Sequence, residues 1–137
     1  MLHILREKGY KATPARLAIL NILTQSHAPV TALTICRELK KDKRNKNINE
    51  ATVYRTLSLF LEGGMITKVD LRKESAYFEL AGTHHHHITC RTCDRVEDFH
   101  DSAIEKAIQN IVRDSSKFIT VNDHSLELFG LCRECAK

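Results

Sequence analysis

Two cysteine pairs of the form Cys-x-x-Cys lie at opposite ends of the second half of this chain. Cys90 and Cys93 form the first pair, and Cys132 and Cys135 form the second. A turn of this spacing presents two thiolates to one ion, so two such turns complete the four-coordinate sulfur site that zinc prefers. The alternative is a dithiol redox pair, although neither pair has a thioredoxin-like βαβ pattern around it. The spacing therefore predicts a structural zinc ion that ties the C-terminal segment to the first pair.

Four successive histidines, at positions 84–87, precede the first cysteine pair. Successive side chains of a β-strand point to opposite faces, so His84 and His86 would share one face and His85 and His87 the other. Each pair is half of a metal site and needs oxygen ligands or another imidazole from elsewhere. A mixed nitrogen and oxygen site suits Fe(II), Mn(II) or Zn(II). Candidates for the remaining ligands are Glu79, Asp98, Glu105, His100, His124 and His27.

Some of these residues have simpler explanations, which the residues alone leave open. Ser102 and Glu105 have the spacing of a helix capping box, in which the carboxylate bonds to a backbone N–H at the helix start. His124 is as readily a polar strand residue as a ligand. The histidine run itself has two alternatives, a polar surface segment and a cloning tag, although a tag would lie at a terminus.

The first half of the chain has the pattern of three helices followed by a β-hairpin. Helix starts are marked by Thr13-Pro14, Thr31 and Asn49, each followed by apolar residues at helical spacing. Segments 65–69 and 75–80, joined by a charged turn, have the pattern of paired strands. Helices followed by a hairpin are the order of a winged helix-turn-helix.

The second half predicts a small sheet with one helix. Strands are expected at 84–90, 96–99, 118–121 and 125–131, and an amphipathic helix at 102–112. So short a segment has a small core, and zinc or dimerisation is needed to stabilise it.

Charge is unevenly distributed between the two halves. Residues 1–80 hold 14 Lys and Arg against 8 Asp and Glu, a net charge of +6, whereas residues 81–137 hold 7 against 9, a net of −2. A basic half joined to a Cys- and His-rich half is consistent with nucleic-acid binding in one and metal binding in the other. With no apolar run of ~20 residues and no signal-peptide pattern at the N-terminus, we expect a cytoplasmic protein that has no membrane partner.

These features together resemble the ferric uptake regulator (Fur) family of bacterial metal-dependent repressors. The order and spacing of the matching segments are specific, although each segment alone is weak. The segments are Gly9-Tyr10-Lys11-Ala12-Thr13-Pro14-Ala15-Arg16, Ala51-Thr52-Val53-Tyr54-Arg55-Thr56-Leu57, Gly63-Gly64-Met65-Ile66, the histidine run, Cys90-x-x-Cys93, Val96-Glu97-Asp98-Phe99, His124-Ser125-Leu126 and Cys132-x-x-Cys135.

The resemblance implies an α+β protein: a winged-helix DNA-binding domain at 1–80, a hinge at 81–83, and a small α/β metal-binding dimerisation domain at 84–137. It implies a homodimer that binds double-stranded DNA at an AT-rich palindromic operator. The implied function is an iron-dependent repressor of metal-uptake genes, with structural Zn(II) and regulatory Fe(II), Mn(II) or Zn(II).

The resemblance also implies three metal sites, each by position in the family pattern. The structural zinc ligands are Cys90, Cys93, Cys132 and Cys135. The regulatory ligands are Glu79, His85, His87 and Asp98, with His27 as a further candidate. The ligands of the second site in the dimerisation domain are His84, His86, Glu105 and His124.

Three positions depart from the iron-type pattern of the family. Pro29 stands where the DNA-binding domain usually supplies a histidine, so His27, two residues earlier, is the candidate replacement. His86 stands where many iron-type members have Asp, and Asp98 where they commonly have Glu and peroxide-sensing members have Asp. The zinc-sensing branch tends to have a cysteine near Glu79, which this chain lacks. These departures favour different metals.

Helix 49–61 is expected to enter the major groove of DNA. Tyr54 would pack on a thymine methyl group and Arg55 would reach guanine or phosphate, whereas the alternative for Tyr54 is core packing. Lys11 resembles the family's minor-groove contact. The full set of predicted DNA-binding residues is Lys11, Arg16, Asn49, Thr52, Tyr54 and Arg55.

Other functions compete with an iron-dependent repressor. A zinc-uptake regulator and a peroxide-sensing regulator would use the same fold and sites. A metallo-hydrolase would need an open metal position and a general base in a cleft, and it leaves the basic half without a purpose. We therefore expect no enzymatic activity; a zinc-storage protein is the remaining alternative.

Overall fold

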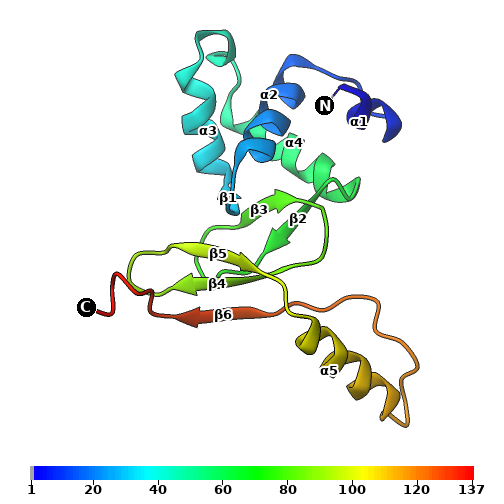
Figure 1. The fold of residues 1–137 in the computed structure, drawn as a ribbon. Coiled ribbons are helices and arrows are strands. Elements are labelled where there is room, and N and C mark those ends of the chain that lie inside the picture. Colours follow the sequence, from blue (N-terminus) through cyan, green and yellow to red (C-terminus); the bar gives the residue numbers. More distant parts are fainter. Residues whose placement is uncertain (1) are drawn as a thin grey trace. The chain divides into compact units, whose positions relative to one another are not determined.

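The computed structural model describes residues 2–137. It divides into two compact units, of which the first ends at Gly82 and the second spans Thr83–Lys137. Figure 1 shows both, with the helices concentrated in the first unit. Among residues 2–137, no helix combines the length and the apolar composition that crossing a bilayer requires.

The helices of the first unit begin where the capping residues predict. The Thr13 hydroxyl accepts a hydrogen bond from the Arg16 N–H at 3.3 Å, and Thr31 and Asn49 do the same for the N–H groups three residues ahead. The helical elements are α1 (Leu2–Glu7), α2 (Pro14–Gln25), α3 (Ala32–Lys41), the short 3-10 helix η1 (Lys43–Asn45) and α4 (Glu50–Glu62).

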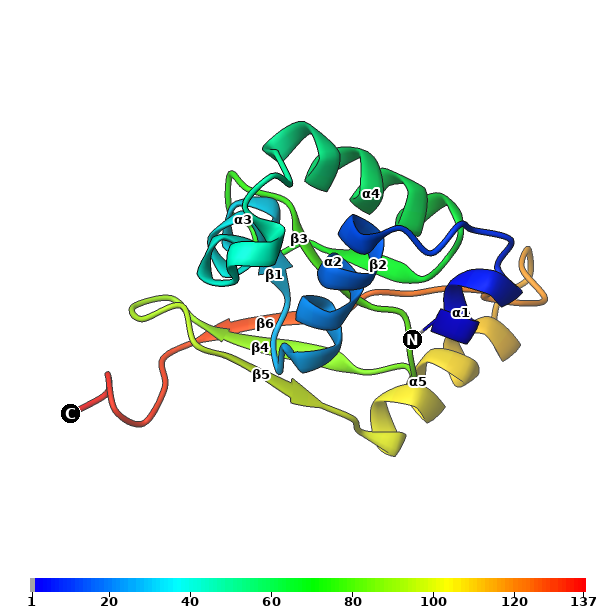
Figure 2. The same cartoon turned by 90° about the horizontal axis from the view of Figure 1, so that it is seen from above.

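A three-stranded antiparallel sheet completes this unit. Its strands are β1 (Val30–Thr31), β2 (Ile66–Val69) and β3 (Tyr77–Leu80), in the order β1-β3-β2. The hairpin β2–β3 is the predicted wing, and Gly64, with φ +62°, supplies the left-handed turn between α4 and β2. Figure 2 shows α2, α3 and α4 gathered beside these strands.

The core of the first unit lies between the helices and the hairpin. Leu5, Ile19, Ile35, Val53 and Phe60 are all fully buried there. Leu5 belongs to α1, a six-residue helix that the sequence patterns do not predict. The side chain of one leucine buried against distant residues is a tertiary effect, which a local pattern does not reveal.

The second unit is a three-stranded sheet with one helix. The strands β4 (His86–Cys90), β5 (Val96–Phe99) and β6 (Glu127–Gly130) run in the order β5-β4-β6, with β4 antiparallel to β5 and parallel to β6. The helix α5 (Ser102–Arg113) follows β5. The central strand therefore contains His86, His87 and Cys90, and each neighbour can place residues beside them.

The predicted strand at 118–121 is wrong, because these residues form no strand. The Ser115 hydroxyl accepts hydrogen bonds from the backbone N–H groups of Lys117 and Phe118 at 3.2 and 3.1 Å, so the chain turns locally here. Phe118 and Ile119 are 68% and 94% exposed. The apolar residues that resemble a strand instead form an exposed segment.

The helix α5 has an apolar face that its own unit covers only in part: Ile104, Ile108 and Val112 are half-buried. None of its residues is buried, and Ile111 is 70% exposed. In Figure 1 the helix extends away from the end of the three strands of its unit.

Candidate metal centres and nucleic-acid interface

The four paired cysteines come together in the second unit. Their sulfur atoms all lie within 4.8 Å of one another, and the Sγ atoms of Cys93 and Cys132 are 3.7 Å apart. In tetrahedral zinc with Zn–S bonds of ~2.3 Å, neighbouring sulfurs are ~3.8 Å apart. The cluster therefore fits zinc in both its donor atoms and its dimensions.

Backbone hydrogen bonds prepare one thiol of this cluster for ionisation. N–H groups of Cys132, Cys93 and Thr92 donate toward the Cys90 sulfur and lower the pKa of its thiol to about 6. At the other end of the cluster, hydrogen bonds with the thiols of Cys132 and Cys93 raise the pKa of Cys135 to about 12. Because zinc binds thiolates, the cluster already holds its first negative charge near neutral pH.

An ion pair holds the two cysteine turns together. Arg95, just after the first pair, donates two hydrogen bonds to the carboxylate of Glu134, at 2.8 and 2.6 Å. Glu134 lies between Cys132 and Cys135. The pair is exposed, so its contribution is orientation of the turns more than stability.

The histidine run divides between the two faces of its strand, as alternation predicts. The rings of His84 and His86 have centroids 4.7 Å apart, and those of His85 and His87 are 4.9 Å apart. The strand begins only at His86, so His84 and His85 precede it. The alternation nevertheless extends to these two residues.

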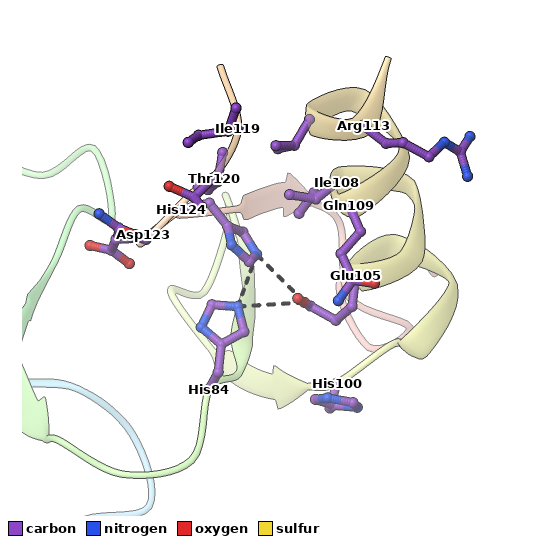
Figure 3. Close-up of a pocket in the computed structure, with 13 residues that line it drawn as sticks. His84, His100, Glu105, Ile108, Gln109, Arg113, Ile119, Thr120, Asp123 and His124 are labelled. Atoms are coloured by element: carbon purple, nitrogen blue, oxygen red, sulfur yellow. Dashed lines mark hydrogen bonds and ion pairs between the residues drawn. The ribbon is translucent and has the colours of Figure 1, made fainter. Parts of the chain in front are cut away.

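The first face forms a cluster of three imidazoles and one carboxylate. The Nε2 atoms of His84 and His124 are 2.9 Å apart, and Glu105 Oε1 lies 2.9 Å from His86 Nε2 and 3.5 Å from each of the other two Nε2 atoms. Figure 3 shows His84 and His124 turned toward Glu105, at one end of a pocket of about 780 Å³. Bonds with His86 above all, and then the charges of the neighbouring imidazoles, lower the pKa of Glu105. The donor set fits a divalent metal ion.

The capping-box interpretation of Glu105 is wrong. The helix α5 is capped by Asp101, whose Oδ1 accepts the N–H groups of Ala103 and Ile104 at 2.7 and 3.3 Å. Because Asp101 satisfies the helix start, the Glu105 side chain is available to the imidazoles.

The second face places Asp98 beside His87. Asp98 is directly opposite His87 in the β4–β5 register, with its Oδ1 3.6 Å from His87 Nε2. His85 Nδ1 is 2.9 Å from the carbonyl oxygen of Thr83. A residue that the sequence patterns do not single out, Glu127, also contacts His87 through Nδ1 at 3.3 Å. Its position in a strand beside β4 is the only signal, and the sequence does not reveal which strands are neighbours.

The remaining predicted regulatory residues, Glu79 and His27, belong to the first unit. Glu79 lies on β3 opposite Thr67, whose hydroxyl is 3.4 Å from its carboxylate. His27 is exposed in the turn after α2. Their participation in a metal site stays a prediction.

The predicted DNA-contacting residues lie in and around α4 and before α2. Tyr54 is 51% exposed, so the alternative that it packs in the core is wrong. Arg55 is also exposed, whereas Val53 and Leu57 are buried, which gives α4 one core face and one free face. Asn49 and Thr52 are joined to each other through the helix cap, and Arg16 donates to the Lys11 carbonyl oxygen at 2.9 Å.

Comparison with known proteins extends over nearly the whole chain. Residues 7–129 match the model of the ferric uptake regulator family. The chain is 33% identical to the peroxide operon regulator of Bacillus subtilis over 136 residues, covering 99% of this chain and 91% of that protein. It is 37% identical to the ferric uptake regulation protein of Cupriavidus metallidurans over 130 residues, covering 93% and 88%.

The fold agrees with a solved structure as well. The crystal structure of the Vibrio cholerae ferric uptake regulator superimposes with a TM-score of 0.82 at 32% identity, covering 96% of this chain and 98% of that one. Family model, relatives and fold lead to one conclusion. The chain belongs to the ferric uptake regulator family of metal-responsive transcriptional regulators.

Proposed function

We propose that this protein is an iron-dependent repressor of metal-uptake genes, which binds operator DNA as a homodimer in the cytoplasm. The observation that supports it most is the division of one histidine run into two donor clusters on opposite faces of β4. A scaffold protein has no need for two separate nitrogen and oxygen clusters beside a sulfur cluster that already fits zinc. Ligands of intermediate softness suit a metal that must exchange.

We assign Cys90, Cys93, Cys132 and Cys135 to structural Zn(II). The regulatory metal, Fe(II) with Mn(II) or Zn(II) as substitutes, is assigned to His85, His87 and Asp98, with Glu79 and His27 completing the ligand set. His84, His86, Glu105 and His124 form a second site in the dimerisation domain. Support for the first assignment is the 3.7 Å sulfur spacing, and for the third the arrangement of three Nε2 atoms around Glu105.

We assign residues 1–80 to DNA binding, 81–83 to the hinge and 84–137 to metal binding and dimerisation. The free face of α4 supports the first assignment, with Tyr54 and Arg55 directed at bases and with Lys11, Arg16, Asn49 and Thr52 around them. The partly covered apolar face of α5 supports the third. An AT-rich palindrome matches a two-fold symmetric dimer, because each half-site meets one protomer.

The proposed mechanism is a shift between orientations of the DNA-binding domains. A regulatory metal that takes ligands from both sides of the hinge favours one orientation, and only that orientation fits two half-sites on one duplex. A metal that binds both orientations equally would change nothing, so the ligands from the DNA-binding domain decide the response.

The test is operator binding against free metal, by fluorescence anisotropy at fixed ionic strength. The double variant His85→Ala, His87→Ala should lose the metal-dependent gain in affinity while retaining zinc. The matched control is His3→Ala, an exposed imidazole of α1 outside every cluster. Wild-type metal dependence in the double variant would contradict the proposal.

Peroxide sensing is a second candidate function, which Asp98 and the relative named as a peroxide operon regulator favour. In that case Fe(II) held by the regulatory ligands would activate hydrogen peroxide. A ligand histidine would be oxidised and would gain one peroxide oxygen, and the other oxygen would leave as water. Mass spectrometry of the iron-loaded protein after peroxide treatment decides between iron sensing and peroxide sensing. Oxygen added to His85 or His87, with loss of DNA binding, would replace iron sensing by peroxide sensing.

A further inference from the structure

A carboxylate lies against the imidazole nitrogen of His87 that faces away from Asp98. Glu127 on β6 is directly opposite His87 in the parallel register of β4 and β6. Both Glu127 carboxylate oxygens are 3.3 Å from His87 Nδ1. The His87 side chain is 3% exposed and that of Glu127 is 17% exposed, so water competes little for this contact.

The three strands thus present one row of residues across the sheet: Asp98, His87 and Glu127. The imidazole in the middle has a carboxylate at each nitrogen, with Nε2 toward Asp98 at 3.6 Å and Nδ1 toward Glu127. A neutral imidazole has one N–H and one lone pair, and only the lone pair binds a metal. The nitrogen that carries the proton therefore determines which side of the ring can coordinate.

We propose that Glu127 is a positioning residue for the regulatory metal: it accepts the Nδ1–H of His87 and so presents the Nε2 lone pair to the side of Asp98 and His85. This inference rests on the proposed assignment of His85 and His87 to the regulatory site. A carboxylate behind a metal-binding histidine fixes the tautomer and ring orientation and raises the basicity of the coordinating nitrogen.

The neighbouring histidines support a specific role. His85 has the backbone carbonyl of Thr83 at 2.9 Å from its own Nδ1, which favours the same tautomer through a neutral acceptor. His86, in the other cluster, is equally buried, yet its Nδ1 has no hydrogen-bond partner among residues 2–137. The Glu105 carboxylate is 2.9 Å from His86 Nε2, so His86 has a carboxylate at one ring nitrogen where His87 has one at each. The second carboxylate is therefore not a general consequence of burying a histidine in this sheet.

The test uses two substitutions of Glu127 and one matched control, all in zinc-loaded protein. Glu127→Leu removes the acceptor, and Glu127→Gln keeps an oxygen acceptor without the charge. Glu97→Gln is the control, because Glu97 is on β5 in the next register row, beside Ile88, where alternation directs it to the other face of the sheet. Zinc content and circular dichroism establish that each variant is folded.

The first measurement is the tautomer of His87, by heteronuclear NMR of protein without regulatory metal, at a pH where the imidazoles are neutral. Wild-type protein and Glu127→Gln should have the proton on Nδ1, and Glu127→Leu should show a mixture of tautomers. The second measurement is the dissociation constant of Mn(II) by electron paramagnetic resonance. It should rise 10–100-fold in Glu127→Leu, the usual effect of losing such a partner, and by less in Glu127→Gln.

The proposal is overturned if Glu127→Leu leaves the His87 tautomer and Mn(II) affinity as they are in Glu97→Gln. A tautomer change without a change in Mn(II) affinity would also overturn it, because Glu127 would then order the ring without serving the metal. If Glu127→Leu does not fold, the isosteric Glu127→Gln decides, and Mn(II) affinity equal to that of the control is the contrary result. If operator binding still depends on metal after His85 and His87 are both replaced, the proposed function is rejected instead. The tautomer measurement does not test that function, so the two failures are distinguishable.

Discussion

His86 and His87 are adjacent in sequence and both are almost fully buried, yet they belong to different donor clusters. The alternation of a β-strand alone separates them, so a sequence pattern was enough to predict this division. The carboxylate partners of these two histidines could not be predicted in the same way. Glu105 comes from a helix and Glu127 from a strand, both far along the chain. The local sequence around Glu105 favours a helix cap as much as a ligand.

At the residue scale, Tyr54 should contribute to DNA affinity and little to stability. Tyr54→Ala should weaken operator binding by about 1–3 kcal/mol, the usual value of a good base contact. Because the side chain is 51% exposed, the free energy of unfolding should change by no more than about 0.5 kcal/mol. Anisotropy titrations and thermal unfolding measure the two effects.

The control for Tyr54→Ala is Ser58→Ala, because Ser58 is also exposed and lies one turn further along α4. Tyr54→Phe should retain most of the affinity, since the ring supplies the contact with the thymine methyl group. Equal DNA binding by Tyr54→Ala and wild type would remove Tyr54 from the interface.

At the element scale, α5 and the segment after it are incomplete within one chain. Ile111, Phe118 and Ile119 are all mostly exposed. The apolar residues of 118–121 predicted a strand because a strand and an exposed apolar segment share the same local pattern. Whether such residues face their own core or a partner is decided by what lies beside them.

The α5 face should be needed for dimerisation. Burying one isoleucine contributes ~1.5–3 kcal/mol, so Ile111→Glu should weaken the dimer at least about tenfold, with a further cost for the buried charge. Sedimentation velocity over a range of concentrations measures this. Asn110→Glu places the same charge on the neighbouring exposed position and should leave the dimer intact; equal dimerisation by both variants would place the interface elsewhere.

At the scale of the whole molecule, the two units depend on different kinds of stabilisation. The first has a core of fully buried apolar residues from α1, α2, α3, α4 and the hairpin. The second has two histidines and one cysteine among its few buried residues, and its helix α5 has no fully buried residue. Structural zinc supplies ~10–16 kcal/mol of apparent folding energy, which matches the whole stability of a domain at ~5–15 kcal/mol.

Removal of zinc should therefore unfold the second unit and spare the first. Strong chelation, or Cys135→Ala, should abolish amide protection in β4, β5 and β6 while α2, α3 and α4 stay protected. Hydrogen exchange measured by mass spectrometry reports the protection of each unit separately. The matched control is Cys36→Ala, because Cys36 is a cysteine of α3 outside the sulfur cluster. Uniform protection after zinc loss would show that the sulfur cluster has no structural role.

The sequence by itself determined the features that depend on neighbours along the chain: the helix starts at Thr13, Thr31 and Asn49, the hairpin, the alternating histidines and the paired cysteines. Capping, pleating and tight turns act over a few residues, so their signals are local. Only the tertiary structure decided that Asp101 caps α5, that Glu105 faces three imidazoles, that Glu127 lies against His87, and that Tyr54 is exposed. Each of these depends on which strands and helices become neighbours, a free-energy balance over the whole unit that no short window of sequence contains.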